Sequence, residues 1–192
     1  MDFAELLEKR RSIRDFEAKE VPIELIREII DDSVKAPNAS NKQAWGFIII
    51  NNKEYMKKLS EVSRQGFIDS VEKNPDSPLK EYAQGLQKRS GDVNFFWNAP
   101  GLVYITGPTD VSTIREDVGL LAAYFMFSAT ARGLGTCWIG MGGGVRDKEI
   151  LKEMGLPQGH HLIAPIIIGY PKDGKIPTMR ARKEPTILKI ID

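Results

Sequence analysis

Residues 10–16 read RRSIRDF, which places three arginines and a serine hydroxyl directly after a short amphipathic segment. Guanidinium groups carry planar, paired donors that suit a phosphate group. A second basic cluster, Arg180, Arg182 and Lys183, lies near the other end of the chain in KIPTMRARKE. Convergence of the two clusters would create a site for a phosphate-bearing ligand. The alternative is that the arginines of residues 10–14 only offset the dipole of a helix end.

The composition predicts one domain, residues 1–192, without a strong overall charge. The 27 basic and 26 acidic residues nearly cancel, so the net charge does not favour a nucleic acid or an anionic membrane as partner. No apolar run approaches the ~20 residues of a membrane span, and the N-terminus has no apolar leader. These features predict a cytoplasmic protein.

The side chains that carry redox or nucleophilic chemistry are sparse. Cys137 is the single cysteine, which excludes an internal disulfide and leaves no cysteine ligand set for a metal. It lies in an apolar run, where a small buried hydrophobe is expected. His160 and His161 begin a strand-like segment and face no nucleophile motif. Any redox chemistry would therefore need a bound organic cofactor.

Hydrophobic spacing predicts helices interleaved with short strands. Helices are expected at residues 2–10, from Pro22 to the break at Ala36, at 53–64, around 79–89, from 114 to a stop at Gly133, and at 146–154. Strands are expected at 47–50, 102–106, 135–139 and 161–170. The last strand is apolar on both faces, as central strands are. Residues 114–129 are apolar over a wide arc, which indicates burial inside the domain or in a dimer.

Two loops and one irregular region complete the candidates. PNASNKQAW at 37–45 offers amides that suit the polar edge of a heteroaromatic ring, although ordinary loops have the same composition. GMGGG at 140–144 allows close backbone approach to a ligand, or is simply a tight connection, and lacks both nucleotide-loop spacings. Residues 66–98 form the least regular part and a plausible roof over a pocket.

Four motifs together, RRSIRDF, APNASNKQAW, GLGTCWIGMG and IPTMRARKE, resemble the nitroreductase family of FMN-dependent oxidoreductases. They occur in the family's order and cover nearly the whole chain. The resemblance implies an α+β, nitroreductase-like fold with a mixed central β-sheet flanked by helices. It also implies an intertwined homodimer that holds FMN at the subunit interface.

The resemblance assigns roles to the basic residues. Arg10 and Ser12 match the positions that grip the FMN phosphate, and Arg180 and Arg182 match the basic pair that closes on it. Arg11 matches a contact to the phosphate or the ribityl chain.

The resemblance places other residues around the flavin ring. Arg14 matches the basic residue beside the pyrimidine end, where it would have a catalytic role by stabilising negative charge at N1 and O2 on reduction. The loop that approaches from the partner subunit is matched by Pro37, Asn38 and Ala39, and its amides make Asn41 and Gln43 further cofactor-binding candidates. The backbone at the N5 edge, where an amide N–H can tune hydride acceptance, is matched by Ile139 and Gly140.

The activity implied is hydride transfer from NAD(P)H through flavin N5 to an electron-poor acceptor, such as a nitroaromatic or a quinone, by a ping-pong mechanism. One alternative is a specialised flavin enzyme of the same fold, either dehalogenase-like or flavin-consuming. The other is a non-catalytic flavin-binding protein. The sequence leaves open the choice between NADH and NADPH.

Overall fold

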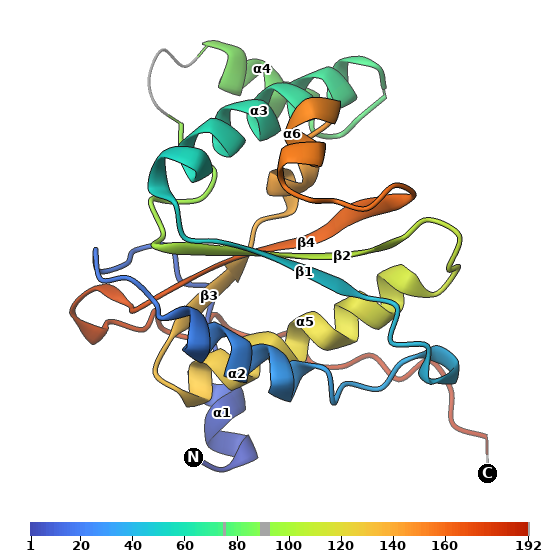
Figure 1. The fold of residues 1–192 in the computed structure, drawn as a ribbon. Coiled ribbons are helices and arrows are strands. Elements are labelled where there is room, and N and C mark those ends of the chain that lie inside the picture. The colour runs from blue at the N-terminus through green and yellow to red at the C-terminus, as the bar shows by residue number, and fades with distance from the viewer. Residues whose placement is uncertain (75, 89–92, 192) are drawn as a thin grey trace.

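The computed structural model describes residues 1–74, 76–88 and 93–191 and shows a four-stranded sheet between two layers of helices (Figure 1). The strands are β1 (Gly46–Ile50), β2 (Gly101–Pro108), β3 (Gly135–Trp138) and β4 (His160–Gly169). One face is covered by α2 (Ile23–Ser33) and α5 (Ile114–Ala131), with α1 (Phe3–Lys9) beyond α5, and the other by α3 (Lys53–Glu72), α4 (Lys80–Lys88) and α6 (Lys148–Glu153). The short helices are η1 (Ala39–Asn41), η2 (Gly140–Gly144) and η3 (Lys172–Gly174).

The sheet has the strand order β1-β2-β4-β3, and every neighbouring pair is antiparallel. The expected mixed sheet is therefore wrong for the described residues, where the one parallel pairing is an isolated bridge between Ser12 and Thr136. A helical connection is long enough to lead into either a parallel or an antiparallel strand, so the spacing of the elements along the sequence does not determine strand direction. The predicted central place of β4 is confirmed, because it lies between β2 and β3.

Local signals set most helix boundaries. The first helix has a capping box, in which Asp2 Oδ1 accepts from the Glu5 N–H at 2.9 Å and Glu5 Oε2 accepts from the Asp2 N–H at 3.3 Å. Helix α5 ends at Ala131, and Gly133 follows with φ +76°, as a glycine stop requires. The fourth expected helix is confirmed over Lys80–Lys88, and the expected residue 89 lies outside the described residues.

Helix α3 continues to Glu72, eight residues past the predicted end at residue 64. Its Gly66 packs directly on the backbone of η2, where a Cβ would lie 1.9 Å from the Gly144 carbonyl oxygen. The glycine therefore serves a close helix contact and does not end the helix. Such tertiary packing overrides the local weakness of glycine in a helix.

Each face of the sheet buries its own apolar cluster. The α2–α5 side includes Ile26, Ile29, Val118, Leu121 and Phe125, and the α3–α6 side includes Met56, Leu59, Phe96, Tyr104 and Ile167. The wide apolar arc of α5 is only partly covered, since Leu120 and Tyr124 remain 46% and 43% exposed. In the described chain, no helix is long and apolar enough to cross a bilayer.

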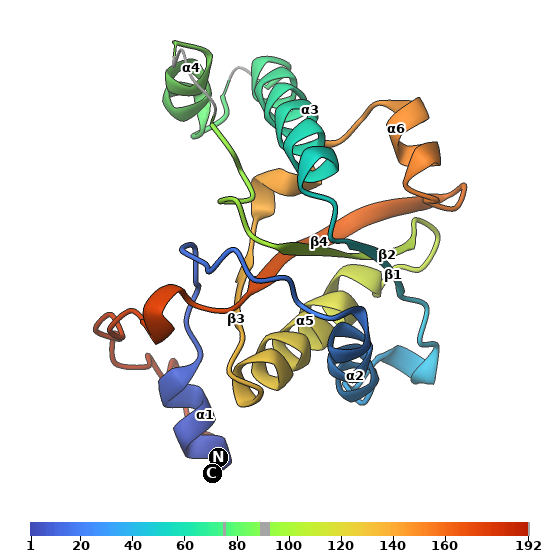
Figure 2. The same cartoon turned by 60° about the vertical axis from the view of Figure 1, so that its left-hand side comes forward.

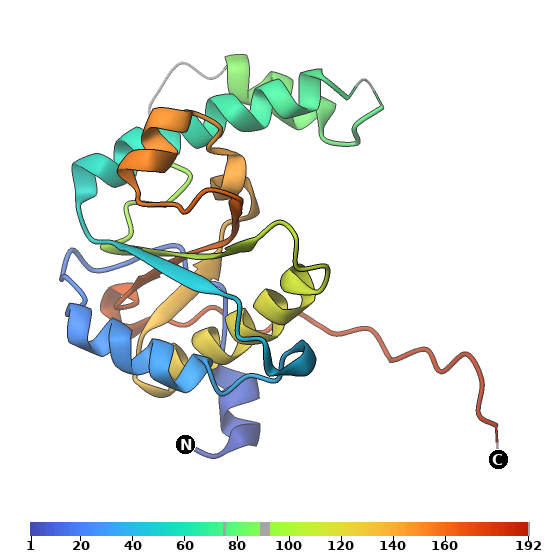
Figure 3. The same cartoon turned by 45° about the vertical axis from the view of Figure 1, so that its right-hand side comes forward.

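The C-terminal residues 175–191 carry no regular secondary structure, and their last part extends away from the body of the domain (Figure 3). Their last part is apolar and almost fully solvent-exposed, with Ile187, Leu188, Ile190 and Ile191 between 71% and 94% exposed. An apolar tail in water is unfavourable, so a covering surface is expected.

Candidate functional site

A cleft of about 1020 Å³ lies between residues 10–15 and residues 172–182. Its described lining contains seven basic side chains, Arg10, Arg11, Arg14, Lys172, Lys175, Arg180 and Arg182, and one acidic side chain, Asp15. This volume is at the upper end of the range for small-molecule pockets, roughly 300–1,000 Å³. The cleft therefore suits a ligand of cofactor size that carries negative charge.

The arginine segment is held against the edge strand β3, as the rising chain after α1 shows in Figure 2. Ser12 forms a parallel bridge with Thr136, and the Ile13 N–H donates to the Thr136 carbonyl at 3.0 Å. Ile13 is buried against Gly135, where a Cβ would lie 2.6 Å from Ile13 Cγ1. Since side chains alternate along an extended segment, burial of Ile13 turns Ser12 and Arg14 to the opposite side, into the cleft.

Arg11 lies partly buried between this segment and α1. Its Nη1 donates to the Arg10 carbonyl at 2.6 Å and to the Leu7 carbonyl at 3.4 Å. Its Nε is buried and has no hydrogen-bond partner among the described residues. A buried unpaired donor is unfavourable, and because this atom has almost no accessible surface, it is not the part of Arg11 that a ligand in the cleft would meet.

The second wall is tied to the first by backbone hydrogen bonds. Phe16 bridges Pro171, and the Lys172 N–H donates to the Asp15 carbonyl at 3.1 Å. The η3 turn follows and leads the chain to Arg180 and Arg182. The two basic clusters of the sequence thus converge within one chain, which a helix-end role for the arginines does not explain.

Five polar or aromatic lining residues were not predicted: Asp15, Trp97, Lys172, Lys175 and Thr178. The Trp97 ring centroid is 5.7 Å from the Arg14 guanidinium carbon, within the range of a cation–π contact. Lys172 and Lys175 could have been predicted as lining residues from the sequence, since both shortly precede the basic cluster at 180–183. No local sequence pattern predicts Trp97, because its place at the cleft depends on tertiary packing.

The loop at residues 37–45 does not line the cleft. Its η1 helix lies at the other end of the sheet from η3 (Figure 1). It is held by Asp117 of α5, a 5% exposed carboxylate that accepts from the Ala39 N–H at 2.9 Å and from the Thr113 hydroxyl at 3.0 Å. Asn38 Oδ1 accepts from the Gln43 N–H at 2.9 Å.

The loop candidates Pro37, Asn38, Ala39, Asn41 and Gln43 are thus brought together with each other and not with the arginines. Asn41 and Gln43 have φ values of +52° and +48°, so the loop holds an uncommon backbone conformation.

Ile139 and Gly140 follow β3 and also do not line the cleft. The Ile139 N–H donates to the Pro165 carbonyl at 2.8 Å and is therefore committed within the chain. Gly140 is exposed, and a Cβ there would meet nothing within 4 Å. Of the two amides matched to the flavin edge, the one at Gly140 is thus the better placed to meet a ligand.

The later glycines of this segment serve packing. A Cβ at Gly142 would lie 2.7 Å from Phe96 Cε1, and one at Gly144 would lie 2.5 Å from the Ser63 carbonyl oxygen. The Gly142 carbonyl accepts from the Ser63 hydroxyl at 3.1 Å and from the Tyr104 hydroxyl at 2.9 Å. The interpretation as a tight connection therefore explains Gly142 and Gly144.

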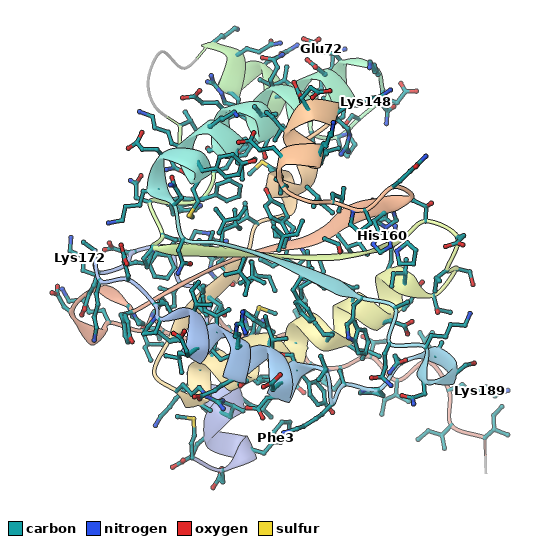
Figure 4. The ribbon with its side chains drawn as sticks, viewed as in Figure 1. Phe3, Glu72, Lys148, His160, Lys172 and Lys189 are labelled. Carbon is teal, nitrogen blue, oxygen red and sulfur yellow. The ribbon has the colours of Figure 1, made fainter. Side chains whose placement is uncertain are left out.

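The remaining titratable candidates show no catalytic arrangement. Burial raises the pKa of the Cys137 thiol, which keeps it protonated, as expected for a small buried hydrophobe. Burial lowers the pKa of His161, which lies at the end of the sheet where Figure 4 labels His160, opposite Lys172. Across the described residues, no group of three or more histidine, cysteine or acidic side chains is arranged to hold a metal.

The fold and the basic cleft define a protein suited to an anionic ligand of cofactor size, and comparison with known proteins identifies the family. The nitroreductase family model matches residues 7–170. The chain is 35% identical to YdgI of Bacillus subtilis, a provisionally assigned NAD(P)H nitroreductase, over 84% of each chain. The chain belongs to the nitroreductase family, and thus to a family of oxidoreductases.

The chain is also similar to one solved structure and to two further relatives. A nitroreductase with bound FMN from Bacteroides fragilis superimposes with a TM-score of 0.81 at 21% identity over all of both chains, which establishes the fold. An iodotyrosine deiodinase from Thermotoga neapolitana is 26% identical over 89% of each chain. The region of this chain that aligns with an archaeal relative from Methanothermobacter thermautotrophicus spans 62% of that relative's length.

Proposed function

We propose that this chain binds FMN and transfers hydride from NAD(P)H to an electron-poor acceptor such as a nitroaromatic or a quinone. The observation that carries the proposal is the convergence of basic side chains from residues 10–14 and residues 172–182 around one cleft. The similarity to FMN-bound and NAD(P)H-dependent members of the family supports it.

The residues of the cleft fit the FMN phosphate. Arg10, Ser12, Arg180 and Arg182 supply charged and hydroxyl donors from both walls. Arg11 also lines the cleft, so its guanidinium would add positive charge beside a phosphate or ribityl oxygen. A dianionic phosphate in this position would offset part of the mutual repulsion among the cations.

When bound, the flavin supplies hydride acceptance and donation at N5, so no protein nucleophile is needed. Arg14 faces the same cleft and would place a fixed positive charge where negative charge develops on reduction. The pyridine nucleotide and the acceptor would use the same opening in turn, which is the ping-pong order. The basic lining raises the local concentration of anionic nucleotides.

We further propose an intertwined homodimer. In one chain the loop at residues 37–43 lies away from the cleft, while α5 exposes Leu120 and Tyr124 and the tail exposes Leu188 and its neighbours. A second copy would cover these apolar surfaces and bring its own loop to the cleft. Sedimentation velocity would measure a dimer, and a monomer at micromolar concentration would contradict the proposal.

The first experiment is a visible absorption spectrum of the purified protein, followed by anaerobic addition of NADH and then NADPH. A flavin spectrum that bleaches with either nucleotide and recovers on adding a quinone or a nitroaromatic supports the proposal. A flavin spectrum that does not bleach favours the non-catalytic binder. A colourless protein that cannot be reconstituted with FMN contradicts the proposal.

A dehalogenase-like activity is a second candidate, because an iodotyrosine deiodinase is among the relatives. Its test uses the same reduced protein, mixed anaerobically with 3-iodotyrosine. Iodide release with reoxidation of the flavin supports this candidate, and reoxidation by nitroaromatics alone excludes it.

A further inference from the structure

The turn that precedes β2 presents one aromatic side chain while it buries two others. Phe95 and Phe96 are 3% and 0% exposed, and the Phe95 N–H donates to the Ser60 hydroxyl at 2.7 Å. Asn94 Oδ1 accepts from the Phe96 N–H at 2.8 Å, and the Asn94 side-chain amide donates to Asn98 Oδ1 at 2.8 Å. Trp97 therefore stands between firmly held neighbours.

The backbone at Trp97 adopts an uncommon conformation. Its φ is +55°, in the left-handed region, and Asn98 follows at +51°. Asparagine tolerates this region, but a bulky aromatic residue rarely occupies it, and such strain concentrates at ligand sites. The consequence here is that the indole turns away from the core and is 50% exposed, while Phe95 and Phe96 fill the core on the near side.

The exposed indole faces the cleft and not bulk solvent alone. Among the described lining residues, Trp97 is the one that comes from outside the segments 10–15 and 172–182. The guanidinium of Arg14 lies 5.7 Å from its ring centroid. The indole and a guanidinium that lies over one face of its ring thus both line the cleft, with the remaining cations along the two walls.

We propose that Trp97 is a specificity-determining residue that packs a planar aromatic acceptor on the ring face opposite Arg14, while the Arg14 guanidinium lies over the other face. This inference rests on the proposed flavin function and names the acceptor class. Aromatic rings stack favourably on indole, and a cation over one ring face favours an electron-poor ring less than it favours the indole itself, so the acceptor is expected on the opposite face. A non-aromatic oxidant would gain no binding affinity from ring stacking on the indole.

The test uses the FMN-loaded enzyme with Trp97→Leu, Trp97→Phe and Trp97→Gly, the last because glycine accommodates the positive φ. Tyr82→Leu is the matched control, since Tyr82 is 47% exposed and outside the lining of the cleft. Each variant is assayed for FMN affinity and for kcat and KM with 4-nitrobenzoate and with ferricyanide, a non-aromatic anionic oxidant.

Trp97→Leu and Trp97→Gly should raise the KM for 4-nitrobenzoate roughly five- to tenfold, the worth of one aromatic contact. The KM for ferricyanide and the FMN affinity should change less than about twofold, and Trp97→Phe should restore most of the nitrobenzoate KM. Equal changes for both oxidants, or a change in FMN affinity alone, would overturn the inference. A parent protein that binds no FMN would instead refute the proposed function.

Discussion

The basic cleft and the loop at residues 37–43 are the two regions matched to a flavin site, and they are built differently. The cleft is assembled from both ends of one chain, and its walls are joined where the Lys172 N–H donates to the Asp15 carbonyl. The loop is also firmly held, by Asp117 and Asn38, yet it lies at the other end of the sheet. The arginines line a cavity, whereas the loop has an ordered shape and does not line that cavity.

This difference is informative because a loop with positive φ values at non-glycine residues is uncommon and unfavourable unless its surroundings enforce it. Asn41 and Gln43 adopt positive φ, and Asp117 is a buried carboxylate committed to one backbone amide and one hydroxyl. Such arrangements persist when the surrounding structure enforces them, and they concentrate at functional sites. A site divided between two copies of the chain gives both regions a function, and the predictions below are designed to break that interpretation.

The largest expected effect comes from removing phosphate contacts in the cleft. Each charge-assisted contact is worth ~1.5–3 kcal/mol, so Arg10→Ala with Arg182→Ala should weaken FMN binding about a hundredfold or more. Equilibrium dialysis or flavin fluorescence titration measures the affinity. The control pair, Arg27→Ala with Lys53→Ala, removes two exposed charges that do not line the cleft and should change the affinity little. Equal losses in both pairs would mean that only net charge matters.

The next effect tests how the cleft wall is attached to the sheet. Gly135→Ala places a Cβ within 2.6–2.9 Å of three Ile13 side-chain atoms, and Ile13 is buried and branched. Overpacking of this kind costs about 1–3 kcal/mol of unfolding free energy, measured by urea denaturation.

The matched control for this change is Gly85→Ala. Gly85 lies in α4 with open space around its Cα, so the added methyl should leave stability unchanged or raise it by up to about 1 kcal/mol. If Gly135→Ala is as harmless as the control, the arginine segment is not locked to β3.

A smaller effect is expected when the loop loses its anchor. Asp117→Ala leaves the Ala39 N–H without its acceptor, and we expect FMN affinity to fall about tenfold if the loop completes the site. Asp117→Asn keeps an oxygen acceptor and should recover most of the affinity. Hydrogen exchange at residues 38–43 reports the loop directly. Faster exchange with unchanged FMN affinity would show that the loop does not serve the flavin.

Local patterns predicted the parts of this molecule that depend on neighbours in sequence. Residues close together in the sequence determine each of these features: the capping box at Asp2 and Glu5, the helix stop at Gly133 and the apolar run of β4. The antiparallel order of the sheet was missed because a long helical connection can lead into a following strand of either direction.

The candidate site divides in the same way. The arginines at residues 10–14 and near residue 180 were predicted, since their charge pattern is visible in the sequence. Trp97 was missed because only the packing of Phe95 and Phe96 turns it toward Arg14. The separation of the 37–43 loop from the cleft within one chain depends on the tertiary fold, which the local sequence pattern does not encode.

A heterodimer decides whether the two regions act across the subunit boundary. One chain carries Arg10→Ala and Arg182→Ala with an intact loop, and the other carries Asp117→Ala with an intact cleft. If cleft and loop come from different chains, one of the two sites in a tandem-tagged heterodimer combines both intact parts. About half of its sites should then bind FMN at a concentration too low for either homodimer. If cleft and loop act within one chain, no site is whole, and the heterodimer should bind no better than the parent variants. Flavin absorbance per purified heterodimer separates these outcomes, because restored binding requires each chain to supply the part that its partner lacks.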